Sequence, residues 1–349
     1  MSSISNHKIL HIVNDNLTAQ ALIDAEIPGE ILPWQDTLYE GPVINFEDIN
    51  SLAIERAKYF AARGYGDYKT IENAYLARNE VLKSFSNYSR VILWFDYDLY
   101  GQLQLMQLVE WFGRQQTGPL EISSIQLDLV KSKSLSKPRI SQMLAMDIQK
   151  LFNNCNEVTL QQTNICSKAW KQFTSKTPDG LLSFHPADLS TMPYLRDAIV
   201  RLVKEFPAKD TGLSRTEYLI IDAVRSKQTN EEDIFEYVQK KEPIAFMSKT
   251  VFLNKINQMI ECKYPILKKE PIEQEVALEI TEENDQINDS TVVHEYTIKV
   301  TNYTNQVLSK WADWIQLNGI NRWVGGVHLS DGNMWRYDSI NRKVKKTYI

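Results

Sequence analysis

Short uninterrupted apolar runs alternate with apolar positions at helical spacing up to about residue 128. The clearest run is VILWF at residues 91–95, which ends at two acids and passes directly into leucines at helical spacing. A run that is apolar on both faces and leads into a helix is typical of a strand in a parallel sheet. Further runs occupy residues 8–13, 30–34 and 121–127. This alternation predicts an α/β fold, with a Rossmann-like parallel sheet in an N-terminal domain at residues 1–130.

The chain from residue 131 to about residue 260 is predicted to be mainly helical. Apolar spacing is helical almost throughout residues 139–206, which predicts a helical connecting region over residues 131–206. A third domain is predicted at residues 207–349. It opens with Ser214 and Glu217, a capping-box signature, and two further short helical segments follow by residue 260.

The remainder of the third domain has a β pattern. β-like runs at residues 264–267, 276–280 and 292–300 follow the three short helices, and this order predicts a winged-helix-like module. Nine acids and no Lys or Arg between Glu270 and Glu295 predict a solvated excursion within its hairpin. A helix at residues 303–317 and a Trp-rich β-hairpin are then predicted. The hairpin strands NRWVGGVHL and NMWRYD are joined by Ser330, Asp331 and Gly332.

The composition narrows the class of protein. With 43% apolar and 24% charged residues, the chain is neither fibrous nor globally disordered. The net charge of −5 argues against indiscriminate nucleic-acid binding by the whole chain. Cys155, Cys166 and Cys262 lie far apart, which disfavours a disulfide scaffold and a thiolate zinc site. Because no leader-like or membrane-spanning apolar stretch is evident, we expect a cytoplasmic location and no membrane partner.

Polar residues gather where the predicted strands end. The candidates for a ligand site are Asn14, Asp36, Glu40, Asp96, Asp98 and Gln102. Carboxyl ends of parallel strands meet at one edge of an open α/β sheet, where ligands bind. We therefore predict an acidic rim that binds a small hydroxyl- or nucleotide-bearing ligand. Carboxylates also suit a divalent cation, so Asp96 and Asp98 are candidate metal ligands, with Mg2+ as the candidate cofactor. Alternatively, Asp98 only caps the following helix and Asp96 is solvated.

Familiar catalytic signatures are absent from the chain. There is no G-x-G-x-x-G, no P-loop and no G-x-S-x-G, so standard dinucleotide, NTPase and α/β-hydrolase sites are excluded. The sequence thus identifies no catalytic residue. His11 lies inside an apolar strand and is predicted to be a hydrogen-bonded core histidine.

Several long motifs together resemble a known family. They are HIVN at 11–14, GEILPWQDTLYEGPV at 29–43, LWFDYDLYGQLQL at 93–105, FPAKDTGLSRTE at 206–217 and RWVGGVHLSDGNMWRYD at 322–338. These resemble the DUF1835 domain-containing proteins of bacteria, a family of uncharacterised function, so the resemblance implies little about activity. Tyr97 stands where family members often have a histidine, and Gly101 where they often have an acid. The residues that keep the family pattern are Asn14, Glu40, Gly41, Pro42, Asp98 and Gln102.

Three hypotheses about function follow from the sequence. The first is the small-molecule ligand at the acidic rim, with or without turnover. The second is a nucleic-acid-associated regulator that uses the winged-helix-like module, although acids nearly cancel the basic residues of that module. The third is a non-catalytic protein-interaction module whose contact surface includes Trp323 and Trp335.

Overall fold

The computed structural model describes residues 8–45, 48–115, 120–125, 138–183, 191–272 and 296–347. The chain forms two compact units, one of residues 1–209 and 320–349 and the other of residues 210–319. This division differs from the three predicted domains. The helical region at 131–206 belongs to the same unit as the sheet, and the last thirty residues or so return to that unit.

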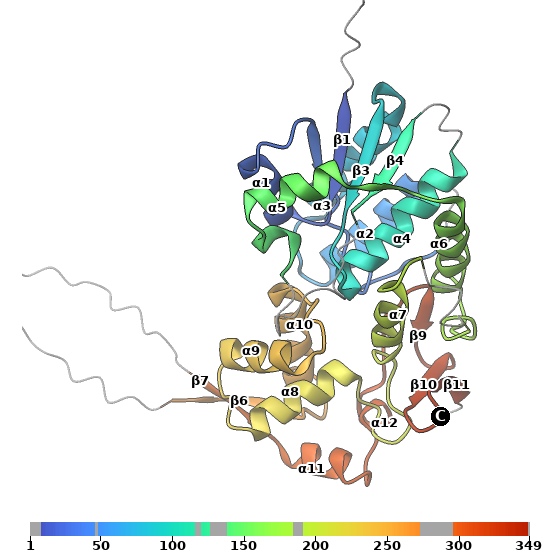
Figure 1. Ribbon diagram of the computed structural model, residues 1–349. Coiled ribbons are helices and arrows are strands. Elements are labelled where there is room, and N and C mark those ends of the chain that lie inside the picture. Colours follow the sequence, from blue (N-terminus) through green and yellow to red (C-terminus); the bar gives the residue numbers. More distant parts are fainter. Residues whose placement is uncertain are drawn as a thin grey trace, which may run out of the picture. The chain divides into compact units, whose positions relative to one another are not determined.

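The first unit is built on a five-stranded, mostly parallel sheet (Figure 1). Strands β1 (Ile9–Val13), β2 (Glu30–Pro33), β3 (Arg90–Trp94) and β4 (Glu121–Ser124) are parallel, and the short β5 (Asn156–Glu157) is antiparallel to β4. The predicted alternation of strands and helices is confirmed here. Its helices are α1 (Asn16–Asp24), α2 (Ile49–Ala62), α3 (Tyr68–Lys83) and α4 (Leu99–Arg114).

The order of the strands reverses beside β1. The sheet runs β2-β1-β3-β4-β5, so the chain moves outward from β1 to β2 and then crosses back to place β3 on the other side of β1. In register, Val13 at the end of β1 lies beside Pro33 of β2 and Trp94 of β3. The residues that follow these three strands therefore emerge at the same edge of the sheet, and a reversal of this kind is where loops diverge.

Helix α4 lies in the core of this unit. Only three of its residues, Tyr100, Gly113 and Arg114, are not buried, and it packs against α6 (Leu160–Phe173) and α7 (Leu195–Val203). A helix buried almost all round is a core element rather than a surface helix. A 3₁₀ turn, η2 (Ile140–Gln142), and α5 (Ala145–Asn153) pack against α1 on another part of the unit. A further 3₁₀ turn among the described residues is η1 (Phe85–Asn87).

The C-terminal residues form two hairpins, and their pairing differs from the prediction. Strand β8 (Arg322–Val324) pairs with β9 (Val327–Leu329) across Gly325 and Gly326, and β10 (Met334–Asp338) pairs with β11 (Lys343–Thr347). The predicted connection at residues 330–332 contributes only an isolated bridge between Ser330 and Asn333. The turn requires glycine at both positions. Gly325 has φ of +60°, which other residues rarely adopt. A Cβ atom would lie 2.4 Å from Phe173 O at Gly325 and 2.2 Å from Thr174 O at Gly326, too close for any side chain.

The second unit contains three helices followed by an antiparallel hairpin. The helices are α8 (Arg215–Arg225), α9 (Glu231–Lys241) and α10 (Lys249–Ile260), and the strands are β6 (Leu267–Pro271) and β7 (Tyr296–Val300). The capping box of Ser214 and Glu217 is confirmed. The predicted runs at 276–280 and 292–295, and most of the acidic excursion, lie outside the described residues.

The predicted helix at 303–317 is two helices. They are α11 (Asn302–Leu308) and α12 (Trp314–Asn318), and the backbone between them includes Lys310 at φ of +66°. Asp313 caps α12 by accepting hydrogen bonds from the backbone N–H groups of Ile315 and Gln316. Apolar spacing continues through this break, so periodicity alone could not reveal it. In the described part of the chain, no helix is long and apolar enough to cross a membrane.

Candidate functional site at the carboxyl ends of β1 and β3

Asp98 caps the helix that follows β3. Its Oδ1 accepts a hydrogen bond of 2.7 Å from the backbone N–H of Gly101, and its side chain is 2% exposed. A Cβ on Gly101 would lie 2.5 Å from Asp96 O, so glycine allows the first turn of α4 to pack directly on the end of the strand. Gln102 fixes the same turn, because its Nε2 donates to Asp96 O at 2.9 Å. Asp98 and Gln102 therefore have clear structural roles.

Asp96, the other member of the acid pair, is also buried. Its Oδ1 accepts a hydrogen bond from the backbone N–H of Ile140 at 2.9 Å, while its buried Oδ2 has no hydrogen-bond partner among the described residues. Burial, and then the nearby charge of Asp98, raise the pKa of Asp96 from 3.8 to about 7. The Ile140 N–H and Arg139 oppose this rise, and Asp15 adds to it. The prediction that Asp96 is solvated is therefore wrong, since the residue is 1% exposed.

Arg139 supplies a positive charge that sequence reasoning missed. Its Nη2 lies 2.7 Å from Asp98 Oδ2, and its Nη1 lies 3.7 Å from Asp96 Oδ2. The two carboxylates raise the pKa of Arg139 although burial alone would lower it. The side chain of Arg139 is 31% exposed, whereas those of the two acids are each 2% exposed. We call Asp15, Asp96, Asp98 and Arg139 the acid–arginine cluster.

Residues after β1 complete the polar edge. Asn14 is fully buried and its Oδ1 accepts from the Thr18 hydroxyl at 3.2 Å, while Asp15 is half-buried and caps α1 through Thr18 N at 2.8 Å. The hydroxyl of Tyr100, on the first turn of α4, donates to Asn14 O at 3.1 Å. Burial raises the pKa of Tyr100, with smaller contributions from Tyr39 and the nearby acids. Tyr100 thus links the end of β1 to the beginning of α4.

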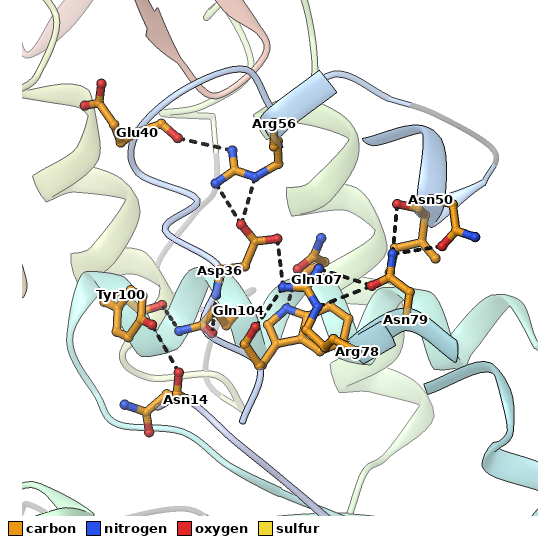
Figure 2. A network of polar contacts seen from close by, with 12 residues as sticks. Asn14, Asp36, Glu40, Asn50, Arg56, Arg78, Asn79, Tyr100, Gln104 and Gln107 are labelled. Carbon is orange, nitrogen blue, oxygen red and sulfur yellow. Dashed lines mark hydrogen bonds and ion pairs between the residues drawn. The ribbon is translucent and has the colours of Figure 1, made fainter. Parts of the chain in front are cut away.

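Asp36 lies in a buried ion-pair network rather than at an open edge. Figure 2 shows its carboxylate between Arg56 and Arg78, which come from α2 and α3. Arg56 Nη2 lies 2.7 Å from Asp36 Oδ1, and Arg78 Nη1 lies 3.5 Å from Asp36 Oδ2. Arg56 also donates to the carbonyl oxygens of Glu40 and Pro42 at 3.1 Å. The network holds the loop after β2 in place, and Asp36 has no free edge toward a ligand, being 1% exposed.

The same network reaches helix α4. Gln104 Oε1 accepts from the backbone N–H of Asp36 at 3.2 Å, and Gln107 Oε1 accepts from the indole N–H of Trp34 at 2.8 Å (Figure 2). The guanidinium of Arg78 lies 3.8 Å from the centroid of the Trp34 ring. Buried amides on α4 are therefore explained by the loop that they hold, since buried polar groups need partners.

Glu40 is held at the far end of this loop. Its Oε1 accepts from the hydroxyl of Tyr59 on α2 at 2.6 Å, and burial followed by the charge of Glu40 raises the pKa of Tyr59. Gly41 has φ of +79° and packs against the same ring. Two residues on, Val43 N donates to Gly325 O at 3.0 Å. Two motifs far apart in the sequence, EGPV and WVGGV, are thus in direct contact.

The predicted site residues therefore fall into two groups. Asn14, Asp96, Asp98 and Gln102 come together at the ends of β1 and β3, joined by Asp15, Tyr100 and Arg139, which the sequence did not single out. Asp36 and Glu40 belong to the network of the β2 loop. Within the described ranges, no group of three His, Cys, Asp or Glu side chains is placed to hold a metal ion. The acid pair contacts the guanidinium of Arg139, and the metal role of Asp96 and Asp98 stays a prediction.

His11 is a buried residue of β1. The prediction for His11 is confirmed: it is fully buried, its Nε2 lies 3.1 Å from Pro28 O, and its Nδ1 accepts from the indole N–H of Trp94. Burial lowers its pKa, so it is a neutral core residue.

Trp335 is 7% exposed, and Trp323 stacks on His328 with 4.4 Å between ring centroids. This arrangement is that of packed aromatics and gives the third hypothesis no exposed pair of tryptophans.

The basic residues of the second unit are mostly paired with acids. Lys249 is ion-paired with Glu232, Lys269 with Glu231 at 3.0 Å, and Lys299 with Glu270 at 2.5 Å. Lys268 also pairs with Glu270. A surface that binds a nucleic-acid backbone normally presents an excess of positive charge, and these pairs reduce it.

Comparison with known proteins adds no assignment. The chain matches no model of a known protein family and no curated protein sequence. The resemblance to DUF1835 domain-containing proteins thus stays a prediction.

Proposed function

We propose that the first unit binds a small hydroxyl- or nucleotide-bearing ligand at the edge formed by the carboxyl ends of β1 and β3. The observation that carries the proposal is the reversal of strand order beside β1, with Asn14, Asp15, Asp96, Asp98 and Tyr100 gathered at that point. In Rossmann-like sheets, which we infer this to be, such a reversal opens the crevice where ligands bind. Carboxylate and phenol oxygens there accept hydrogen bonds from ligand hydroxyls.

The accessible groups define what the ligand meets first. Asp96 and Asp98 are buried, whereas Asp15, Tyr100 and Arg139 are half-buried. We therefore assign first contact with the ligand to Asp15 and Tyr100. The helix N-termini of α1 and α4 offer little to a bare phosphate, because Asp15 and Asp98 place a carboxylate at each terminus and accept one of its free N–H groups. A ligand recognised through hydroxyls fits this edge better than one recognised through a phosphate alone.

Asp15→Asn is the sharpest test of this proposal. Asn keeps the helix cap but loses the charge, so we expect an unchanged melting temperature and at least a tenfold loss of affinity for the nucleoside, nucleotide or sugar that binds the wild type. The measurement is thermal shift with a ligand library, followed by titration calorimetry. Asp67→Asn is the matched control, because Asp67 caps α3 through Thr70 N in the same way. No stabilisation of the wild type by any of these ligands at millimolar concentration would contradict the proposal.

For the second unit, we infer a winged-helix-like module that contacts protein rather than nucleic acid. The helix order, the β6–β7 hairpin and the hydrogen bond of 2.7 Å from Ile298 N to Thr229 O, before α9, support the fold. The paired lysines support the choice of partner. We expect no binding of duplex DNA or RNA by fluorescence anisotropy at low salt. Binding that weakens steeply as salt rises would contradict this, because such a slope reports phosphate contacts.

A further inference from the structure

Strand β11 and the residue before it carry a local excess of positive charge. The cations are Arg342, Lys343, Lys345 and Lys346. All four are exposed, and none of them forms an ion pair with another described residue. The chain as a whole has a net charge of −5, so this excess belongs to the hairpin and not to the chain. A concentration of one sign of charge attracts a partner of the opposite sign.

The backbone of β11 has a free edge. On one side the strand pairs with β10, and no strand among the described residues pairs with its other side (Figure 1). Tyr337 of β10 fixes the phase of this pairing, because its N–H donates to Pro207 O at 2.8 Å and its carbonyl oxygen accepts from Lys209 N at 2.9 Å. Tyr337 therefore makes no ladder hydrogen bond with Val344, the residue opposite. Since backbone groups alternate in direction along an antiparallel strand, those of Val344 and Lys346 point away from β10.

The side chains of β11 alternate as well. Lys343 and Lys345 lie on one face of the hairpin, about 7 Å apart along the strand, and the half-buried Val344 between them lies on the other face. Lys345 is also directly opposite Arg336 of β10, and like charges in this position disfavour the hairpin by itself. A third strand with acids on the lysine face and an apolar side chain beside Val344 would match this pattern and relieve the repulsion.

The charge and the free edge together select the partner. Lysines on an edge strand keep it from pairing with strands of like charge, so a second copy of β11 is disfavoured. A nucleic acid would neutralise the lysines with its phosphates, but it has no repeating N–H and C=O groups that match the edge of a sheet. An extended acidic peptide satisfies both the charges and the backbone groups.

We propose that the free edge of β11 is a docking site for an extended acidic segment of a partner protein, which adds to the β10–β11 hairpin as a third strand. The backbone groups of Val344 and Lys346 continue the ladder, and the acids of the segment lie beside Lys343 and Lys345. This surface is separate from the ligand site at the ends of β1 and β3. It also differs from the surface of the third hypothesis, since the contact is a strand edge and not a pair of tryptophans.

A short synthetic peptide of alternating Glu and Val residues is the probe. Labelled with fluorescein, it should bind the full chain saturably in fluorescence anisotropy. The same peptide methylated on its backbone nitrogens keeps every charge but cannot donate to the edge, so it should bind about tenfold more weakly or worse. Equal affinities of the two peptides would overturn the docking site, because charge alone would then account for the contact.

Variants of the protein test the backbone and the charges separately. Val344→Pro removes an N–H that points away from β10 and keeps all four cations, so it should weaken binding of the peptide by about tenfold. The double variant Lys343→Glu, Lys345→Glu should abolish binding, and unchanged affinity in it would overturn the proposal. Lys168→Glu, Lys171→Glu, at exposed positions of α6, is the control with the same change in net charge and should bind as the wild type does. If Val344→Pro does not fold, the methylated peptide still tests the backbone contact.

Two further outcomes would decide against this site. Absence of peptide binding at millimolar concentration would mean that the lysines only protect the edge from self-association. Tighter binding of a single-stranded oligothymidylate of the same charge than of the peptide would assign the lysines to nucleic acid. Neither outcome bears on the small-molecule site, because no nucleoside, nucleotide monomer or sugar enters these measurements.

Discussion

Replacement of Asp36 by Asn is expected to lower the free energy of unfolding by about 3–5 kcal/mol, because it leaves two buried arginines without a counter-charge. Arg56 is fully buried, Arg78 is 7% exposed, and both contact the Asp36 carboxylate. The size of this effect comes from the charge left behind rather than from the strength of the pair. Urea unfolding followed by far-ultraviolet circular dichroism measures it.

The companion variants show whether the charge is the cause. Arg56→Met should cost a similar amount, because it removes the partner that also holds the carbonyl groups of Glu40 and Pro42. The double variant Asp36→Asn, Arg56→Met should cost less than the sum of the two single variants. Both charges of the pair are then absent, so neither is left buried without the other. Glu55→Gln is the control on the same helix: its pair with Lys58 is exposed, so the expected change is below about 1 kcal/mol. A loss of less than about 1 kcal/mol in Asp36→Asn would show that water reaches the network.

The elements of the fold were predictable where their signals are local. The apolar run that became β3 and the leucine spacing of α4 each depend on residues within one element, and the cap at Asp98 depends on a group three residues away. The position of Asn14, Asp96 and Asp98 at one edge followed from parallel pairing alone. These predictions needed no knowledge of how distant segments meet.

The chemical state of the site residues was not predictable in the same way. Asp36 and Asp96 have the same type of position in the sequence, each just after a strand, but Asp36 meets Arg56 and Arg78 while Asp96 meets Arg139. These partners come from other helices or turns, and no local pattern marks which arginine will reach which acid. The hairpin predicted at residues 330–332 was wrong for a related reason. Both GG and SDG are turn signals, and the tertiary contacts of the two glycines favour the pairing of β8 with β9.

Asp96→Asn is expected to stabilise the protein at pH 8 and to have little effect at pH 4. The pKa of Asp96 is about 7 in the folded chain, against 3.8 for an unperturbed aspartate. Between these values the folded protein holds a proton that the unfolded chain has lost, so the contribution of this group to stability falls as pH rises. The fall is about 1.4 kcal/mol per pH unit, and it reaches at most about 4 kcal/mol once pH exceeds 7.

The asparagine variant removes this dependence while keeping the local structure. Its Oδ1 can still accept from the backbone N–H of Ile140, and the buried charge is absent at every pH. We therefore expect the difference in unfolding free energy between variant and wild type to grow from near zero at pH 4 to a gain for the variant at pH 8. Taking the difference cancels groups such as His11, whose lowered pKa acts in the opposite direction. Asp24→Asn, at an exposed position of α1, is the control variant. A flat difference for Asp96→Asn would contradict the raised pKa of Asp96, because it would show that this carboxyl titrates alike in the folded and the unfolded chain.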